Sequence, residues 1–448
     1  MSDIVAPAGE KRANSPGLKL LAVILLTVLM IVPLFAINLA LSDREGRAAE
    51  AAGDIASGWG ATQTIAGPVI FIPYDVDVQS VVDGKSVVTT NHDEAVVLPS
   101  QLSVKAKVDT TKRARGIFEV PVYTSNIDIG ASFGPAAFAG LFPDNARVDW
   151  KNAYTVVLVN DPRGLSGNVA LRVNNRDVPF QPGIGTMSKN ANGMHAPLGL
   201  SGAPNGLTLS THIGLRGSQE LSVAPLGQQT TAAIHSGWPD PSFFGNFLPA
   251  DRRVSPKGFD ATWSVPYLAR GYAQSFRSAA DAMPLLTSSL FGVKFYQPVG
   301  FYQLVERSLK YAILFVGLSL LVFFVTELMS APRLHVVQYT LIAAAQVLFY
   351  LLLLSFAEHI GFGYSYLAAA AATVLLTAAY ALSVFASRKV AAVLCVLLGT
   401  LYGLLYVILR QEDDALLIGA VLLFAALAAT MYATRRMDWS RVAALPQV

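Results

Sequence analysis

The residues that could carry acid–base, nucleophilic or metal chemistry are few, and their spacing matches no complete catalytic motif. The six histidines stand apart, with no H-x-x-x-H pair and no cysteine partner, so the sequence predicts no metal site. The single cysteine, Cys395, excludes a pair of redox-active thiols. A G-x-S-x-G string surrounds Ser132, but a nucleophile elbow lies between a strand and a helix, and the sequence here is strand-like throughout. We therefore predict no catalytic residue, no metal and no cofactor.

Ionisable residues do gather in two short segments, which form a first candidate site. Glu358 and His359 are adjacent between two apolar stretches, and one basic and three acidic residues stand between the next two. If both segments reach the same membrane face, a carboxylate beside a histidine could exchange protons there. The alternative, which the residue types favour, is a solvated rim. The residues of this predicted polar cap are Glu358, His359, Arg410, Glu412, Asp413 and Asp414.

A second candidate site is an aromatic segment at residues 236–249. It holds three prolines and two glycines, and because proline fixes φ while glycine frees it, we predict a shaped loop instead of a strand. Such a loop could bind a partner, a glycan or a lipid headgroup. The alternative, which we favour, is that it closes the end of a β core with Trp238 and Phe243 buried. The aromatic residues are Trp238, Phe243, Phe244 and Phe247.

Long apolar segments must position the polar cap. Only 14% of the chain is charged, against about 25% in a typical soluble domain. Residues 336–357, 360–387, 390–409 and 415–434 carry no charge, and about 20 helical residues span the roughly 30 Å hydrocarbon core of a bilayer. We predict five transmembrane helices within residues 309–434 and a sixth at 18–41. The segment at 18–41 is longer than a cleaved signal sequence requires, so it is interpreted as a signal anchor.

The positive charges predict the orientation of these helices. Basic residues prefer short cytoplasmic loops, and every loop that six crossings would place inside contains Lys or Arg. Both short outer loops are net acidic. We therefore expect residues 1–17 and 435–448 in the cytoplasm and residues 42–308 in the periplasm. The deciding basic residues are Lys11, Arg12, Lys19, Arg333, Arg388, Lys389, Arg435, Arg436 and Arg441. Gln346 is expected inside the bilayer, and Glu327 near an inner helix end, where it can reach the interface.

Residues 42–308 predict a large, mostly β domain inserted between the first and second helices. Short β-branched runs alternate in polarity, as in Val104-Lys105-Ala106-Lys107-Val108, which is typical of a strand with one wet face. Turn residues separate these runs. The domain is expected to be a sandwich or two related β units, and the alanine-rich stretch 48–56 to extend or follow the first helix.

Several ordered strings along the chain are similar to one family. They include residues 302–305, 350–355, 358–362 and 434–439, together with the segment 238–249. On these strings the chain resembles the CreD family of inner-membrane proteins. The resemblance implies a cell-envelope integrity protein, associated with a two-component signalling system, colicin tolerance and β-lactam responses. It implies no catalytic residue.

Three functions remain open. The sequence favours a non-enzymatic envelope protein whose β domain senses or binds something outside while the helices anchor or couple. A transporter or lipid-handling protein is the second, although charges within the helices are nearly absent. The third is an envelope enzyme acting at the periplasmic membrane face. Expected partners are membrane lipids and either envelope components or other membrane proteins, with no nucleic acid.

Overall fold

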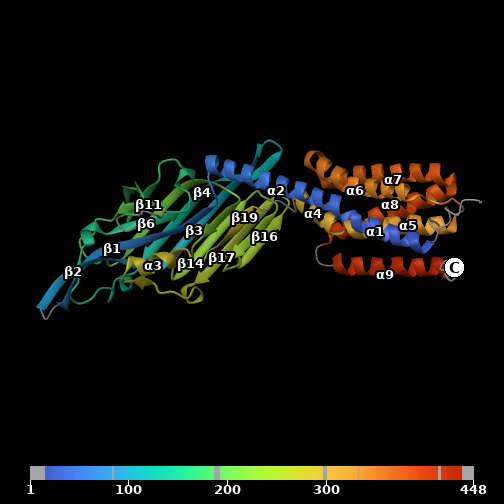
Figure 1. Cartoon of the computed structure of the whole chain (residues 1–448). Coiled ribbons are helices and arrows are strands. Elements are labelled where there is room, and N and C mark those ends of the chain that lie inside the picture. Colours follow the sequence, from blue (N-terminus) through green and yellow to red (C-terminus); the bar gives the residue numbers. More distant parts are fainter. Residues whose placement is uncertain are drawn as a thin grey trace, which may run out of the picture. The chain divides into compact units, whose positions relative to one another are not determined.

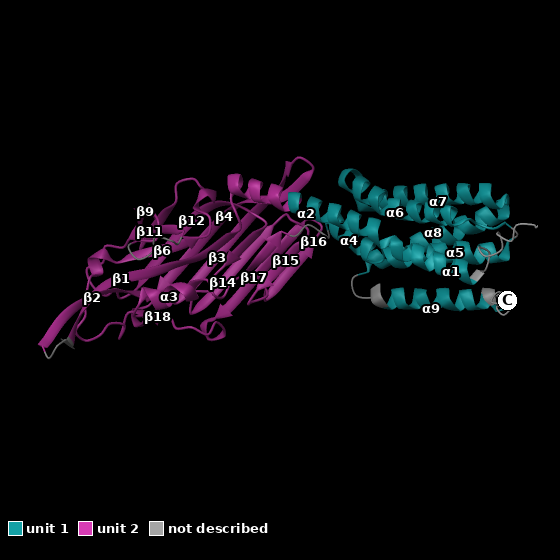
Figure 2. Ribbon diagram, in the orientation of Figure 1, with its two compact units in different colours: residues 1–47, 299–448 teal, residues 48–298 magenta. Residues whose placement is uncertain are grey.

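The computed structural model describes residues 16–82, 85–185, 192–295, 300–330, 332–411 and 415–435. The chain forms two compact units, which are coloured separately in Figure 2. Residues 1–47 and 299–448 make the helical unit, and residues 48–298 make the β unit. The chain therefore passes between the units twice.

The described part of the helical unit consists of helices (Figure 1). One N-terminal helical stretch, Gly17–Trp59, and four C-terminal helices, α5 to α8, are long and apolar enough to cross a membrane. The last expected crossing is α9, whose apolar part, Leu417–Tyr432, is shorter. The bounds are α1 (Pro16–Leu29), α2 (Ile31–Trp59), α4 (Phe301–Lys310), α5 (Ala312–Met329), α6 (Val336–Ile360), α7 (Phe362–Phe385), α8 (Arg388–Arg410) and α9 (Ala415–Thr434).

Backbone chemistry explains where the helices break. Pro33 has no N–H to donate to the preceding turn, and α1 gives way to α2 at Met30. The alanine-rich stretch extends the first helix, because α2 continues to Trp59. Between α6 and α7 the chain turns at Gly361, whose φ of +76° suits a residue without a Cβ. The predicted second helix begins earlier than expected, as α4, and restarts after Tyr311 as α5.

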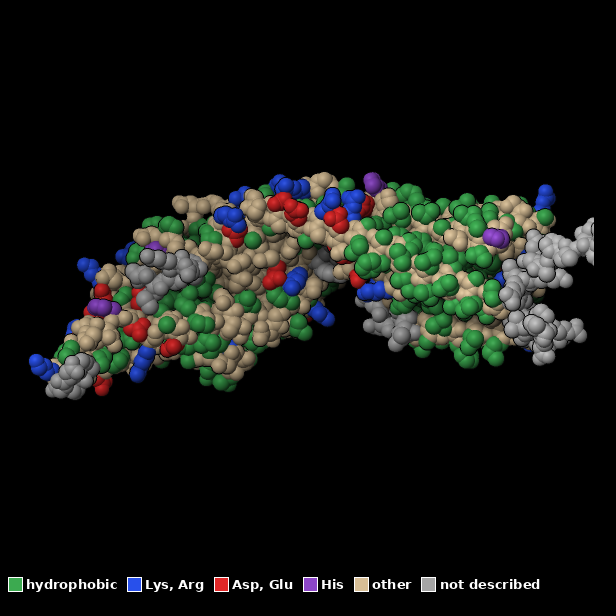
Figure 3. Space-filling view, viewed as in Figure 1, with side chains coloured by type: hydrophobic (Ala, Val, Ile, Leu, Met, Phe, Trp, Pro, Cys, Tyr) green, Lys and Arg blue, Asp and Glu red, His purple; other side chains and the backbone are tan. Residues whose placement is uncertain are grey.

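The surface of the helical unit is apolar. Figure 3 shows hydrophobic side chains over most of its visible face. Leu367 is 68% exposed and Phe424 is 74% exposed. Exposure on this scale is rare on soluble monomers, and it suits a surface covered by lipid.

The β unit consists of two sheets, and the expectation of a β-rich domain is confirmed. The described strands of the first sheet run in the order β10-β11-β6-β1-β13-β19-β15, with β2, β5 and β18 attached. Their bounds are β1 (Gln63–Val82), β2 (Lys85–Val97), β5 (Arg147–Val148), β6 (Tyr154–Val159), β10 (Gln181–Pro182), β11 (Gly193–Pro197), β13 (Glu220–Val223), β15 (Pro241–Gly245), β18 (Ser275–Phe276) and β19 (Phe291–Phe295). A short helix, α3 (Ala279–Leu286), precedes β19.

The second sheet has the order β16-β17-β14-β3-β4-β12-β8-β9, with β7 beside β12. Its long central strands alternate buried and exposed residues, as the sequence around Lys105 predicts. The bounds are β3 (Gln101–Arg115), β4 (Phe118–Phe133), β7 (Leu165–Ser166), β8 (Ala170–Val173), β9 (Arg176–Pro179), β12 (Leu207–Ser218), β14 (Gln229–Ser236), β16 (Asp251–Ser255) and β17 (Gly258–Pro266).

The inner faces of the two sheets share one apolar core. Trp263 of β17 stacks on Phe291 of β19 with ring centroids 5.3 Å apart. The ring of Tyr123 on β4 also crosses the core, tilted against the ring of Phe295 on β19 with centroids 5.0 Å apart. One buried cluster includes residues from both sheets. The unit is therefore a sandwich and not two separate β units.

The aromatic segment 236–249 is not wholly a loop, so this expectation was wrong in part. Pro241–Gly245 forms strand β15, which pairs antiparallel with β19. The strand tolerates Pro241 because it lies at the edge of its sheet and the proline is its first residue. Trp238 is buried, and its indole N–H donates to the carbonyl oxygen of Asp240 at 3.1 Å.

Candidate functional site

Glu358 lies where three helices of the helical unit meet. Its side chain is only 7% exposed. The hydroxyl of Tyr302 on α4 donates a hydrogen bond to its carboxylate at 3.1 Å. The Nε atom of Arg44 on α2 is 3.6 Å from the same oxygen. We call Arg44, Tyr302 and Glu358 the Glu358 junction.

The local sequence of α6 fixes Glu358 in place. The helix begins with a capping box in which His335 and Gln338 satisfy each other's backbone N–H groups, and it ends at Gly361. Glu358 therefore falls in the last turn, where the helix dipole disfavours a carboxylate. Arg44 and Tyr302 offset this cost with a positive charge and a hydrogen-bond donor.

Both chain connections between the two units lead to this junction. Arg44 lies on α2 just before the first passage into the β unit, after residue 47. Tyr302 lies in the first turn of α4, just after the second passage, at residue 299. A single carboxylate on α6 thus contacts both connecting segments.

The hydroxyl of Tyr302 remains protonated at physiological pH. Burial is the main cause that raises its pKa above the ordinary tyrosine value, and the hydrogen bond to Glu358 raises it further. Tyr302 can therefore act only as a donor toward the carboxylate. Tyr302 therefore keeps its proton, and the Glu358 junction holds α2, α4 and α6 together through contacts with one carboxylate.

Among the other predicted cap residues that the structure describes, none joins Glu358. His359 is exposed, and its Nδ1 is 3.1 Å from the carbonyl oxygen of Ser355 on its own helix. Arg410 is exposed, with its guanidinium 5.0 Å from the centroid of the Tyr406 ring. The remaining members of the predicted cap, Glu412, Asp413 and Asp414, lie outside the described residues. The sequence did not indicate Arg44 as a partner.

A second polar cluster lies toward the other end of α6. Lys19 of α1 and Glu327 of α5 form an ion pair of 2.5 Å, and the hydroxyl of Tyr339 donates to Glu327 at 2.7 Å. Lys19 also donates to the carbonyl oxygen of Leu334 at 3.2 Å. The sequence suggested that Glu327 extends away from the bundle, whereas the structure shows it buried and paired with Lys19. Tyr339 and Glu358 are 19 residues apart on α6, or about 28 Å, which is close to the thickness of a bilayer core.

Neutral hydrogen bonds connect the helices between these two clusters. The Tyr402 hydroxyl on α8 donates to the Gln346 side chain on α6 at 2.5 Å. The Tyr366 hydroxyl on α7 donates to the Tyr402 carbonyl oxygen at 2.6 Å. Gln346 is buried in the interior of the bundle. Such bonds between polar side chains hold helices together in an apolar surrounding.

Comparison with known proteins agrees with this architecture. The family model described as inner membrane protein CreD matches residues 15–440. The chain belongs to the CreD family. Inner membrane protein CreD of Escherichia coli (strain K12) is 31% identical over 418 residues, covering 92% of this chain and 91% of that protein. The resemblance seen in the sequence is confirmed, and this CreD-family chain is an inner-membrane protein with membrane helices and a β domain.

The predicted aromatic site of this CreD-family protein is part of the packing between its sheets. Phe243 packs edge-on against Phe259 and Trp263, at 5.6 and 5.9 Å. Phe247 packs against Phe291 at 6.5 Å. Phe244, which is half-buried, has the ammonium group of Lys294 4.9 Å from its ring centroid. These contacts agree with the interpretation that the segment closes the β core.

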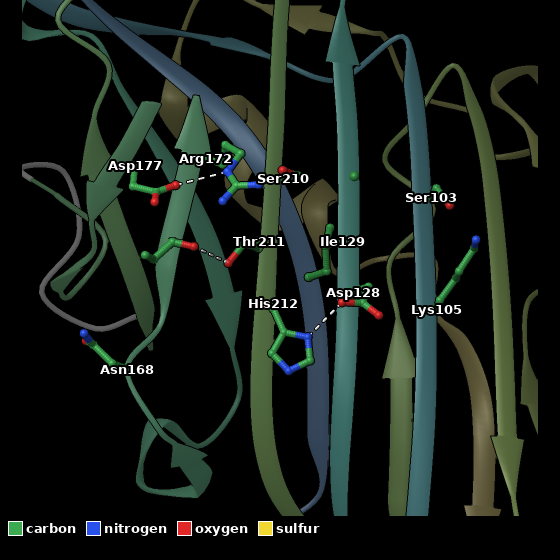
Figure 4. Close-up of a pocket in the computed structure, with 12 residues that line it drawn as sticks. Ser103, Lys105, Asp128, Ile129, Asn168, Arg172, Asp177, Ser210, Thr211 and His212 are labelled. Atoms are coloured by element: carbon green, nitrogen blue, oxygen red, sulfur yellow. Dashed lines mark hydrogen bonds and ion pairs between the residues drawn. The ribbon is translucent and has the colours of Figure 1, made fainter. Parts of the chain in front are cut away.

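The outer face of the second sheet is a polar surface of the β unit. Two hollows of about 530 and 370 Å³ lie on it and share Lys105 and Asp128. Figure 4 shows the larger hollow, with Lys105, Asp128 and His212 on three neighbouring strands. The His212 ring nitrogen Nδ1 lies 2.8 Å from the Asp128 carboxylate. This face, unlike the aromatic segment, is open to solvent.

Proposed function

We propose that this CreD-family protein is a non-enzymatic receptor of the bacterial cell envelope. In this proposal the helices cross the inner membrane six times, both termini lie in the cytoplasm and the β unit lies in the periplasm. The β unit binds an envelope component, and the helical unit responds to its occupancy. Lipids contact the apolar helix surfaces.

The observation that carries the proposal is the convergence of both connecting segments on Glu358. A change in the β unit can reach the helical unit only along the chain segments that join them, or through direct contact. Arg44 and Tyr302 lie on those two segments, and both bind the same carboxylate. A signal that moved either segment would alter the pairing of Glu358 and with it the packing of α6.

The charge distribution supports the proposed orientation. Lys19 pairs with Glu327 at the end of the bundle where the N-terminal tail and the loop with Arg333 meet the helices. Basic residues in short loops favour the cytoplasmic side. The Glu358 junction, about 28 Å away along α6, then lies at the periplasmic surface.

Complementation tests the proposal in a strain that lacks the protein and is sensitive to envelope stress. We expect Glu358→Gln to lose most of the complementing activity at normal abundance, because the amide keeps the size of the side chain but not the charge that pairs with Arg44. Arg44→Gln should have the same effect.

Two matched controls come from the same helices. His359→Gln should complement fully, because His359 is exposed and contacts its own helix. Glu306→Gln on α4 should also complement, because its partner, Lys310, lies one turn away on the surface. Full activity of Glu358→Gln and Arg44→Gln would contradict a coupling role for the junction.

A further inference from the structure

Arg270 is a buried charged residue of the β unit without a counterion. The residue is 6% exposed, and no carboxylate pairs with it in the described part of the chain. Each of the other three buried charged residues that the structure describes has a polar or charged partner. Those partners are Tyr154 for Glu94 at 2.8 Å, Arg163 for Asp161 at 2.8 Å and Lys19 for Glu327 at 2.5 Å. A buried charge without a counterion is strongly unfavourable, so this exception indicates a partner from outside the chain.

Three hydrogen-bond donors at this position have no acceptor. They are the Nε and Nη1 atoms of Arg270 and the hydroxyl of Tyr272, all of them buried. The remaining nitrogen of Arg270, Nη2, donates to the side-chain oxygen of Gln274. Burial raises the pKa of Tyr272 above the ordinary tyrosine value, although the charge of Arg270 opposes this shift, so the hydroxyl keeps its proton. All three groups can therefore donate to an anion.

The stacking of Arg270 on Tyr272 leaves these donors available. The guanidinium carbon lies 4.5 Å from the centroid of the Tyr272 ring. Such stacking uses the flat face of the guanidinium, whereas its N–H groups point outward in its own plane. The ring thus holds the cation in place without accepting its hydrogen bonds. A planar acceptor such as a carboxylate suits the edge of the guanidinium.

The site lies where three connections between the two sheets meet. Residues 267–274 follow β17 of the second sheet and lead to β18 of the first. The Gln274 side chain donates to the carbonyl oxygens of Pro99 at 2.6 Å and Leu226 at 3.3 Å. Pro99 lies between β2 and β3, and Leu226 lies between β13 and β14, which are two other such connections. Gln274 therefore fixes both Arg270 and its segment to this end of the sandwich.

The surface segment that contains Arg270 can open to admit a ligand. Ala269, Gly271 and Ala273 are exposed, so the chain on both sides of Arg270 lies at the surface. Among the described backbone hydrogen bonds, none joins residues 268–273 to a strand, and the Arg270 N–H donates to Tyr267 within the segment. Local opening of such a segment breaks no strand pairing.

We propose that Arg270 and Tyr272 bind the carboxylate of an envelope molecule, which enters beneath residues 268–273. The Arg270 N–H groups and the Tyr272 hydroxyl donate to the carboxylate oxygens, and the guanidinium provides the opposite charge. A carboxylate carries the single negative charge that one guanidinium balances, whereas a phosphate monoester carries about −1.5 to −2. This inference deepens the proposed function and rests on it, because it assigns a ligand class to the β unit.

Acetate is the probe, and thermal unfolding of the purified full-length protein in detergent measures its binding. Tryptophan fluorescence follows the β unit, which contains four of the five tryptophans. We expect sodium acetate to raise the melting temperature of the parent relative to sodium chloride at equal ionic strength and pH 7. The rise should be about 4 °C at ten times the dissociation constant. Acetamide, which has the shape of acetate without its charge, should have no effect.

Three variants show whether Arg270 causes this response. Arg270→Met should abolish it, and should melt at or above the parent in chloride, because an apolar side chain replaces a buried charge. Tyr272→Phe keeps the ring on which Arg270 stacks but removes one donor, so it should bind acetate a few-fold more weakly and melt like the parent in chloride. Arg253→Met is the matched control: Arg253 is exposed on β16, so the acetate response should not change.

Several outcomes would overturn the proposal. They are equal melting temperatures of the parent in acetate and chloride, an undiminished acetate response in Arg270→Met, and equal stabilisation by acetamide. If Arg270→Met does not fold, undiminished acetate affinity of Tyr272→Phe would reject the site. A larger Arg270-dependent response to inorganic phosphate than to acetate would reject the assignment to a carboxylate.

These results are separable from the complementation test of the proposed function. An acetate response of the parent, together with full complementation by Glu358→Gln and Arg44→Gln, would support the site and reject the coupling role. No acetate response, together with loss of complementation in those two variants, would leave the receptor proposal standing and reject this site.

Discussion

Lys19 and Glu327 are 308 residues apart in the chain, and their side chains form an ion pair of 2.5 Å inside the helical unit. The exposures of these side chains are 16% and 6%, so water screens the pair poorly. The pair links α1 to α5, while Tyr339 adds α6 through its bond to the same carboxylate. Three helices are therefore joined by one charged group at the end opposite the Glu358 junction.

Removal of one partner of this pair should destabilise the helical unit. We expect Glu327→Gln to cost about 3–5 kcal/mol, because it leaves Lys19 buried without a counterion. The double variant Lys19→Met/Glu327→Met should recover much of that loss, because neither charge remains. Thermal unfolding of the purified protein in detergent measures both effects. A double variant that is less stable than Glu327→Gln would contradict this account.

The buried tryptophans should contribute to the stability of the β unit. Trp263 is 2% exposed and stacks on Phe291 across the core, so Trp263→Ala should cost about 3–5 kcal/mol. Trp238→Ala should also lower the melting temperature, because Trp238 is 8% exposed. Leu268→Ala is the control: Leu268 is 79% exposed, so its loss should change stability by less than about 0.5 kcal/mol. An unchanged melting temperature for Trp238→Ala would show that the indole is free for binding.

Asp77 should give the β unit a pH dependence in the acid range. Hydrogen bonds from Arg147 and Thr90 lower its pKa from 3.8 to about 2. A lowered pKa in the folded state stabilises the protein above the unfolded value, and this contribution is lost as pH falls through the folded value. The parent should therefore lose stability relative to Asp77→Asn between about pH 4 and pH 2. If the melting temperatures of the two proteins fell by equal amounts across this pH interval, the contribution of Asp77 would be ruled out.

A fluorescent reporter can test the orientation of the chain. A protein that fluoresces only in the cytoplasm should emit light when fused after Val448, and should remain dark when inserted in the hairpin between Val82 and Lys85. Strands β1 and β2 are paired as far as Val82 and Lys85, so an insertion between these two residues leaves the strand pairing intact. The reverse pattern would place the C-terminus outside the cytoplasm and the β unit inside it, and would contradict the proposed orientation.

The sequence alone determined the class of the protein and much of its local structure. Uncharged runs of about 20 residues predict membrane-crossing helices because only a helix satisfies its backbone groups within lipid. The alternation around Lys105 likewise predicts one wet face for β3, because successive strand side chains point to opposite sides. The sequence did not distinguish a strand from a loop at Pro241. Proline is tolerated both in a turn and as the first residue of an edge strand, so its presence does not decide between them.

Only the tertiary structure decided which distant residues meet. The sequence grouped Glu358 with its neighbour His359 and with the next loop, whereas the fold pairs it with Arg44 and Tyr302 from two other helices. The same holds for Lys105 of β3, whose register partner Ala233 lies on β14, a strand far away in the chain. Periodicity fixes the face on which a side chain lies, because each helix or strand has its own repeat. It does not fix which element packs against that face, because that depends on burial and pairing summed over the whole chain.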